Sequence, residues 1–181
     1  MPDITLCCNF LNEIENVRAI FNWFGSVISE IIIVDTGSTD GTQELCRKLG
    51  ARVYQIRGVP GYGEMRTLTV HLARTDWAII IDGDERMLPQ DVYKLPELSK
   101  MDVDCIWLPR QHYRSWDMTI CENPDIKTYA DWQARFVRVK PSIYWIRKVH
   151  EQIRGIISDY HSFDNPVIRH FGWLKTDERK Q

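Results

Sequence analysis

Several features that define common classes of protein are missing from this sequence. No apolar segment approaches the roughly 18 residues that a membrane span requires, and the N-terminal residues show neither the basic region nor the cleavage site of a secretory leader. There is no G-x-G-x-x-G segment, which argues against a dinucleotide-dependent oxidoreductase. Internal repeats and low-complexity segments are also missing. We therefore predict a single domain over residues 1–181, with a cytoplasmic location as the default.

Cysteine is scarce, and its spacing favours neither disulfide nor metal chemistry. The five cysteines are an odd number, and no two of them form a C-x-x-C pair. The adjacent Cys7 and Cys8 would point to opposite faces of one strand. We predict buried free thiols, rather than a disulfide framework or a zinc site, at Cys7, Cys8, Cys46, Cys105 and Cys121.

Charge is nearly balanced over the whole chain but not along it. The net charge is −2, with 44% hydrophobic and 27% charged residues, a composition typical of a folded soluble domain. Acidic residues outnumber basic ones in residues 1–105, and the reverse holds in residues 106–181, where most histidines and tryptophans also lie. Such residues are most often core or solvated surface, but a mildly basic, aromatic surface could also bind an anionic group or stack on a ring-shaped ligand.

Two short apolar runs end in carboxylates. Residues 77–81 (WAIII) lead into Asp82-Gly83-Asp84, and residues 30–34 (EIIIV) lead into Asp35. Each run is typical of a buried strand with charge at its exposed tip, so we expect the Asp35 carboxylate to lie outside the core. Asp82 and Asp84, which flank a small glycine, could both turn toward one divalent ion. Acidic tips on separate strands of an open α/β sheet indicate one crevice.

Each motif also has a plainer interpretation. Asp-Gly is a common turn dipeptide, and Thr39 or Asp40 could simply cap the following helix. A calcium-binding EF-hand loop is excluded by spacing, because that loop needs glycine at its sixth position. The sixth residue is Asp40 when counted from Asp35, and Met87 when counted from Asp82.

The hydrophobic pattern predicts alternating strands and helices in the first half of the chain. We expect strands at 4–8, 30–35, 52–56 and 77–82, helices at 13–24, 42–49 and about 65–72, and a loop at 58–63. This order requires a mainly parallel sheet with right-handed crossovers. After Pro89, aromatic and β-branched runs predict antiparallel strands at 105–108, 134–139, 143–146 and 149–153. We therefore predict an α/β fold with a smaller antiparallel C-terminal part.

The order of the segments CCNFLNE, IIIVDTGSTDGT, AIIIDGDE, DWQARFVR and VHEQI resembles glycosyltransferase family 2 over almost the whole chain. The resemblance implies a GT-A fold, which is Rossmann-like, a nucleoside diphosphate sugar as donor, Mn²⁺ or Mg²⁺, and inversion at the sugar carbon. We place nucleotide-sugar binding at about 1–88, acceptor binding at about 89–174 and a frayed tail at 175–181.

The resemblance also implies roles for individual residues. Asp84 is then the main metal ligand, and Asp82 contacts the ribose or the metal. Asp35 occupies the place where family members bind the base of the nucleotide, and Asn12 and Glu13 lie beside that pocket.

The resemblance bears on four further positions at this donor and metal site. Arg66, on the helix between the acidic strands, could contact the diphosphate, although such an arginine is usually solvated. Thr67 stands where relatives often have asparagine, which puts the diphosphate contacts in doubt. Gly83 stands where they often have alanine, a change that we expect to be sterically mild. His170 matches a late histidine that closes the metal site in some GT-A enzymes; its plainer interpretation is structural.

An inverting displacement needs a carboxylate base opposite the leaving group, and the second half offers Asp131 and Glu151. We favour Glu151, because a strand at 149–153 would turn either His150 or Glu151 into the cleft. A single carboxylate in a strand is more often an exposed surface residue, so Asp131 remains the alternative.

These features together predict an inverting, metal-dependent glycosyltransferase that moves a hexose-like sugar to a hydroxyl, as in the synthesis of a surface polysaccharide or another glycoconjugate. The acceptor stays open among a saccharide, a lipid-linked glycan, a protein and a modified nucleic acid, and its recognition could depend on a partner subunit or a homo-oligomer. A sugar nucleotidyltransferase would want a glycine-rich loop with Arg or Lys after the first strand, where this chain has NFLNE. Intact Asp82, Asp84 and Glu151 argue against a catalytically inactive nucleotide-sugar-binding subunit.

Overall fold

A computed structural model of the chain describes residues 3–58, 61–115, 117–119, 121, 131–163 and 166–172. Its first half contains β1 (Ile4–Phe10), α1 (Ile14–Phe24), a 3-10 turn η1 (Gly25–Val27), β2 (Glu30–Asp35), α2 (Thr42–Lys48), β3 (Arg52–Gln55), α3 (Tyr62–His71) and β4 (Trp77–Ile80). The predicted α/β alternation is confirmed. The expected loop at 58–63 is shorter than predicted, because α3 already begins at Tyr62.

The second half contains β5 (Glu85–Arg86), α4 (Pro89–Val92), α5 (Leu95–Leu98), β6 (Cys105–His112), β7 (Asp131–Arg138), β8 (Tyr144–Ile146), β9 (Gln152–Arg154), β10 (Asp159–His161) and β11 (Ile168–His170). The strand predicted at 149–153 is wrong in its first half. β9 begins only at Gln152, because Arg147 and His150 have φ angles of 76° and 53°, which an extended strand cannot contain. The predicted tail at 175–181 lies outside the described residues.

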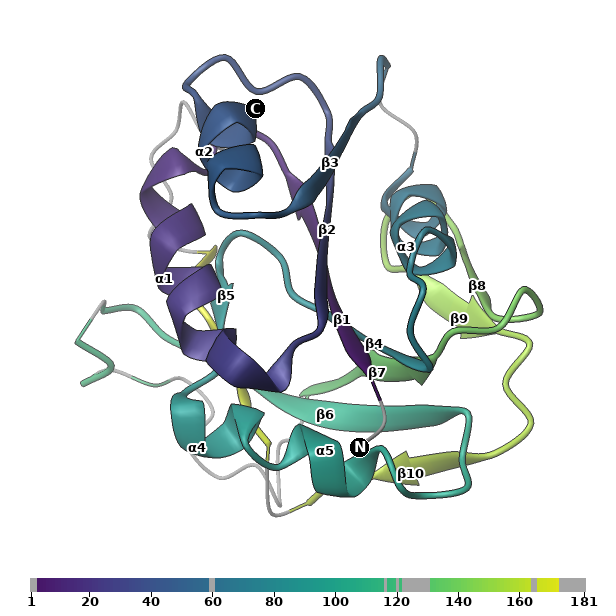
Figure 1. The fold of residues 1–181 in the computed structure, drawn as a ribbon. Helices are drawn as coiled ribbons and strands as arrows, with labels where there is room; N and C mark the ends of the chain where they lie inside the picture. The colour runs from purple at the N-terminus through teal and green to yellow at the C-terminus, as the bar shows by residue number, and fades with distance from the viewer. Residues whose placement is uncertain are drawn as a thin grey trace.

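One nine-stranded sheet joins both halves of the chain, in the order β3-β2-β1-β4-β7-β6-β11-β5 with β10 also paired to β6. The strands from β3 to β4 are parallel, whereas β7 is antiparallel to both β4 and β6. In Figure 1, α1 and α2 lie on one side of the sheet, and α3 lies on the other side beside the small antiparallel pair of β8 and β9.

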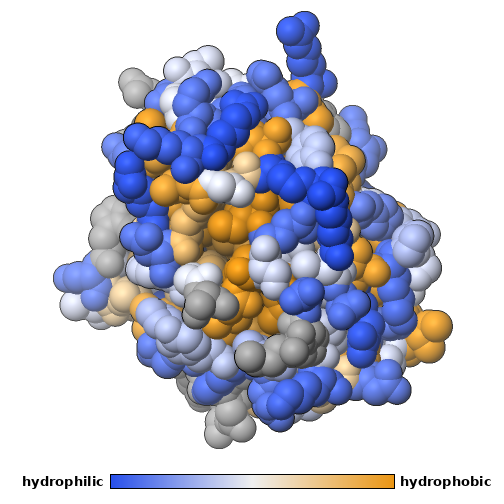
Figure 2. Space-filling view, viewed as in Figure 1, coloured by the Kyte–Doolittle hydropathy of each residue, from blue (hydrophilic) through white to orange (hydrophobic). Residues whose placement is uncertain are grey.

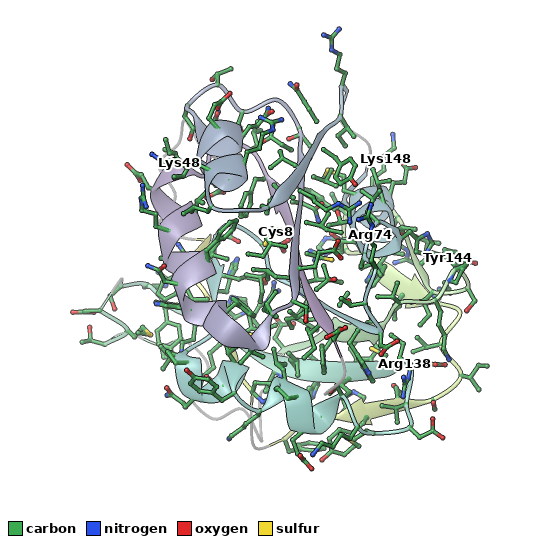
Figure 3. All side chains as sticks on the ribbon, viewed as in Figure 1. Cys8, Lys48, Arg74, Arg138, Tyr144 and Lys148 are labelled. Atoms are coloured by element: carbon green, nitrogen blue, oxygen red, sulfur yellow. The ribbon has the colours of Figure 1, made fainter. Side chains whose placement is uncertain are left out.

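Alternation along the strands produces a core on each face of the sheet. In β1, Leu6 and Cys8 belong to the larger apolar cluster, while Cys7 belongs to the smaller cluster on the opposite face. All five cysteines are free thiols, and all except the partly exposed Cys121 are buried, so the predicted buried thiols are confirmed at four positions. Figure 3 labels Cys8 between the sheet and the helices of one face.

The core reaches the surface at its rim. Partly buried apolar residues, among them Ile28, Ile31 and Val53, pack against the larger cluster. Figure 2 shows apolar side chains in a band through the middle of this view, with hydrophilic side chains around it. Within the described residues, every helix is too short or too polar to cross a membrane.

Candidate active site

The acidic segment that follows β4 lies where the strand order of the sheet changes direction. Strands β1, β2 and β3 extend to one side, and β4 pairs with the other edge of β1. Ligands of open α/β sheets bind at such a switch point, beyond the carboxyl ends of the strands. Asp82 and Asp84 belong to a tight turn here, in which the Glu85 N–H donates to the Asp82 carbonyl oxygen at 2.9 Å.

At this switch point, Gly83 lies directly beside the side chain of Glu13, in the loop that follows β1. A Cβ atom at position 83 would lie 2.3 Å from the carboxyl carbon of Glu13. Glu13 is 3% exposed, and its Oε2 atom accepts a hydrogen bond from Asn16 Nδ2 at 2.6 Å. The end of the Glu13 side chain fills the space that a methyl group at position 83 would need, so alanine fits here only if this buried side chain moves.

Two buried arginines hold the Asp82 carboxylate. Its Oδ2 atom accepts hydrogen bonds from Nη2 of Arg66, on α3, and from Nη2 of Arg135, on β7, both at 2.8 Å. The two arginine side chains are 9% and 2% exposed. Burial alone would lower the pKa of Arg66, but the charges of Asp82, Glu151 and Glu85 outweigh burial and raise it. Both guanidinium groups therefore stay charged beside Asp82.

Glu85 also belongs to this charge network, although the sequence motifs assign it no role. Its side chain is fully buried; Oε1 accepts from Arg135 at 2.7 Å and from Arg110 at 3.2 Å, and Oε2 accepts from the Asp82 N–H at 3.0 Å. Burial and the negative charge of Asp82 raise the pKa of Glu85 to about 8, while Arg110 acts in the opposite direction. Glu85 thus fixes the backbone of Asp82 as well as the position of Arg135.

Asp84 faces His170 across a space that Gly172 leaves open. His170 Nε2 lies 3.6 Å from Asp84 Oδ2. A Cβ atom at position 172 would lie 2.6 Å from this Nε2 and 3.3 Å from this Oδ2. A carboxylate oxygen and an imidazole nitrogen at this separation fit a shared divalent cation such as Mn²⁺. The predicted pairing of Asp84 with His170 is therefore sterically consistent with a metal site.

The described residues offer such a cation no complete set of side-chain ligands. No group of three His, Cys, Asp or Glu side chains in the described part of the chain could hold a metal ion. The Oδ2 atom of Asp82, the third predicted ligand, accepts hydrogen bonds from Arg66 and Arg135 instead. Mg²⁺ and similar ions commonly take only one or two protein ligands and complete their coordination with water and substrate phosphates.

Glu151 joins the same network through Arg66. Its Oε1 atom lies 3.3 Å from Arg66 Nε, and its side chain is 19% exposed. The turn before it is fixed against the start of α3, since the Tyr62 N–H donates to the Lys148 carbonyl oxygen at 3.0 Å. Figure 3 labels Lys148 beside α3. Glu151 is thus placed by a turn with two left-handed residues, and not by strand alternation as predicted.

Asp131 lies in a separate contact group. Its Oδ2 atom accepts from Arg110 Nε at 2.8 Å and lies 3.0 Å from His112 Nε2, and its Oδ1 atom accepts from Gln133 at 2.7 Å. Although burial opposes ionisation, the hydrogen bond with His112 and the charge of Arg110 lower the pKa of Asp131 to about 2. Such a carboxylate is a weak proton acceptor.

The end of β2 differs from the expectation. Asp35 is fully buried rather than exposed at a tip. Its Oδ1 atom accepts hydrogen bonds from the Gly37 and Ser38 N–H groups at 2.9 and 2.8 Å and from Gln43 Nε2 at 2.7 Å. Asn12 joins the same loop, because its N–H donates to Ser38 Oγ at 2.8 Å. The Asp35 carboxylate therefore organises the loop after β2, and it takes up its hydrogen-bonding capacity in doing so.

A cavity of about 100 Å³ opens beside Glu151 and the arginine pair. Its walls contain Arg66, Arg135, Glu151, Gln133, Ala134, Ile153 and the tryptophans Trp107, Trp132 and Trp145. The Nη1 atoms of Arg66 and Arg135 are buried and have no hydrogen-bond partner. The cavity therefore combines two arginines, one carboxylate and three aromatic rings.

Comparison with known families decides the class of the chain. The family model for Glycosyl transferase family 2 matches residues 11–141. The chain belongs to this family. An uncharacterized glycosyltransferase of Rickettsia conorii is 36% identical over 76 residues, which cover 42% of this chain and 27% of that protein. A TPR repeat-containing protein of Synechococcus elongatus is 21% identical over 183 residues, which cover 96% of this chain and 43% of that protein. The chain thus spans less than half the length of these relatives.

Solved structures confirm the GT-A fold of this family 2 chain. S. aureus TarS 1-349 in complex with UDP-GlcNAc superimposes with a TM-score of 0.71 at 12% identity, over 99% of this chain and 61% of that one. Glucosyl-3-phosphoglycerate synthase from Mycobacterium tuberculosis, in complex with Mn²⁺, UDP-glucose and phosphoglyceric acid, gives a TM-score of 0.53 at 21% identity, over 76% of this chain and 57% of that one.

The family 2 motifs left two charged groups of this site without a role. Glu85 follows the second aspartate directly, so its position was visible, but its complete burial depends on arginines from distant strands. Arg135 occurs within the segment DWQARFVR, and only the antiparallel pairing of β7 with β4 brings it to Asp82. The signal available in the sequence was Arg135 next to the apolar residues Phe136 and Val137, because an arginine that such a strand buries needs a charged partner.

Proposed function

We propose that this family 2 domain transfers a sugar, with inversion, from a nucleoside diphosphate sugar to an acceptor hydroxyl, with Glu151 as the base and Asp84 and His170 as ligands of a divalent cation. The observation that carries the proposal is the link through Arg66, which contacts Asp82 on one side and Glu151 on the other. One rigid guanidinium group thus holds the candidate base beside the acidic turn.

The donor side of the proposal rests on the acidic turn and the fold. A cation bound by Asp84 and His170 would supply positive charge to the departing diphosphate. UDP-sugars are the first donors to test, because TarS and glucosyl-3-phosphoglycerate synthase were each solved with a UDP-sugar. The chain's own contribution is to hold Asp82 between two arginines, so that this end of the site is already ordered before the donor arrives.

The acceptor side rests on the cavity. Glu151 lines it together with three tryptophans, whose faces can stack on a sugar ring. The charged side chains of Arg66 and Arg135 line the same cavity and would favour an acceptor rich in oxygen atoms. Glu151 is better suited than Asp131 to take the proton of the attacking hydroxyl, because Asp131 already accepts from Arg110 and Gln133 and has a pKa of about 2.

Metal dependence can be tested by calorimetry with UDP-glucose and UDP-GlcNAc, each in the presence of Mn²⁺ and of a chelator. We expect binding to require Mn²⁺, and Asp84→Asn to remove most of the difference between the two conditions. Equal affinity of the unmodified domain under both conditions would refute the role of the metal. Asp91→Asn is a control carboxylate variant, since Asp91 pairs with Arg169 outside the acidic turn.

The base can be tested without knowing the acceptor, by measuring the release of UDP when water replaces the hydroxyl. Glu151→Gln should slow this release by about 10²–10⁴-fold with nearly unchanged donor affinity. Asp131→Asn serves as the comparison. If Asp131→Asn proved the slower variant and Glu151→Gln stayed near full activity, the two roles would be reversed.

A further inference from the structure

Four neighbouring strands carry a row of polar side chains across the sheet. Strands β7, β6, β11 and β5 lie in this order. Asp131 begins β7 opposite Arg110 of β6, and His112 at the end of β6 lies opposite His170 at the end of β11. Asp84 directly precedes β5, and the Phe171 N–H donates to its carbonyl oxygen at 2.8 Å. The row therefore leads from Asp131 to the space between His170 and Asp84.

Each member of this row is within hydrogen-bonding distance of the next until the row reaches Asp84. Asp131 Oδ2 lies 3.0 Å from His112 Nε2, and His112 Nδ1 lies 2.9 Å from His170 Nδ1. The two imidazole rings meet edge to face, with an interplanar angle of 85°. The other nitrogen of His170, Nε2, faces Asp84 Oδ2 at 3.6 Å.

The charge of Asp131 determines which nitrogen atoms carry protons. An ionised carboxylate can only accept, and Asp131 already accepts from Arg110 and Gln133, so His112 must donate from Nε2. A neutral imidazole carries one proton only, so His112 Nδ1 is then an acceptor. His170 must therefore donate from Nδ1, and its own single proton is used there. What remains at His170 Nε2 is a lone pair that faces Asp84.

Each direction makes a ring nitrogen lone pair face a carboxylate at one end of the row, and the two ends differ in distance. In the proposed direction the two acceptors, His170 Nε2 and Asp84 Oδ2, are 3.6 Å apart, a gap that a cation could fill. The opposite direction is disfavoured because its two acceptors are closer. If neutral His112 donated from Nδ1, its Nε2 lone pair would lie 3.0 Å from the ionised Asp131 carboxylate, and two acceptors would face each other. His170 would then carry its proton on Nε2. That proton would point toward Asp84, and the protonated Nε2 atom could not coordinate a metal ion.

We propose that Asp131 and His112 are positioning residues, which fix the tautomer of His170 and keep its Nε2 lone pair directed at Asp84 for a divalent cation. This inference rests on the metal dependence proposed above and adds two residues outside the cation's own ligands. Histidine ligands commonly donate their second ring N–H to an oriented partner, which sets the tautomer. Here the partner is a second histidine, and the carboxylate lies one step further away.

The proton positions can be measured directly in the metal-free protein. In ¹⁵N-histidine-labelled protein at about pH 8, where an ordinary imidazole is neutral, the ¹⁵N shifts distinguish a protonated from an unprotonated ring nitrogen. We expect His170 to be protonated at Nδ1 and unprotonated at Nε2, with the signals assigned by His170→Gln. Protonation of His170 at Nε2 would overturn the inference, whatever the metal affinity.

A variant tests the consequence for the metal. His112→Phe keeps an aromatic ring against His170 but removes the acceptor at Nδ1, so we expect the Mn²⁺ affinity measured by calorimetry to fall about 10–100-fold. His161→Phe is the matched control, because His161 packs against Trp107 and Trp132 outside the row. The control should bind Mn²⁺ like the unmodified protein.

The two measurements separate this inference from the proposed function. If His112→Phe bound Mn²⁺ as tightly as the unmodified protein while His170→Gln did not, the positioning role would be wrong and the metal site would stand. If the unmodified protein bound no Mn²⁺, the proposed metal dependence would fail. The ¹⁵N shifts of His170 would still decide whether Asp131 and His112 set its tautomer.

Discussion

Gly83→Ala provides a sharp test of the switch point, since the family pattern and this structure predict opposite outcomes. The new methyl group would lie 2.3 Å from Glu13 Cδ and 2.5 Å from its Oε1. Overpacking of this kind costs about 1–3 kcal/mol. If Glu13 moves away instead, it loses its hydrogen bond with Asn16, and a hydrogen bond to a charged group is worth about 1.5–3 kcal/mol. In either case we expect a loss of roughly 1–3 kcal/mol in the free energy of unfolding.

For a chain of this length, 1 kcal/mol corresponds to about 2–4 °C in Tm, so the variant should melt roughly 2–12 °C lower. Thermal unfolding followed by circular dichroism measures this directly. A melting temperature within about 2 °C of the unmodified protein would refute the steric argument. Position 83 has no left-handed φ angle, so backbone strain does not complicate the result.

A double variant isolates the contact itself. Glu13→Ala removes the side chain that Gly83→Ala would strike, so the second substitution should cost much less in the Glu13→Ala background. The coupling free energy of the double-mutant cycle should exceed about 1 kcal/mol. Additive losses would mean that the methyl group meets some other obstacle.

Two further predictions concern the charged network and the space beside His170. Gly172→Ala should lower Mn²⁺ affinity, measured by calorimetry, because its methyl group would displace the His170 ring; unchanged affinity would remove this pair from the metal site. Glu85 keeps its proton up to about pH 8 when folded and loses it near pH 4.5 when unfolded, so the free energy of unfolding should fall as pH rises between these values. Glu85→Gln should flatten this fall in urea denaturation series, and an unchanged slope would show that Glu85 is already ionised.

Local pattern was sufficient to predict the parallel half of the fold. The spacing of apolar residues in α1 and the apolar runs of β2 and β4 are properties of consecutive residues, and they gave the correct elements within a few positions. The position of Glu151 could not be obtained in this way. It depends on left-handed φ angles at Arg147 and His150, which are uncommon for every residue except glycine, although histidine adopts them more often than most.

Contacts between distant strands account for the rest of what the sequence did not reveal. The role of Asp131 depends on its pairing with Arg110 across β6 and β7, and the burial of Asp35 depends on how the loop after β2 folds back onto it. In both cases the sequence shows the carboxylate but not the residues that donate hydrogen bonds to it. A carboxylate at a strand end can be a ligand, a base or an anchor for a loop, and only its partners distinguish these roles.

The partners of the acidic turn also couple the stability of the domain to its chemistry. Glu85 is fully buried in β5, where carboxyl oxygens without hydrogen-bond donors would be costly. Its donors, Arg110 and Arg135, come from β6 and β7, so these strands must be in place before Glu85 has its partners. Because Arg135 also holds Asp82, which Arg66 links to Glu151, the contacts that stabilise the sheet junction are the same contacts that set the geometry of the candidate base. Substitutions of these arginines should therefore change folding and catalysis together, whereas His112 and Glu151, at the two ends of the site, can be changed to test chemistry separately.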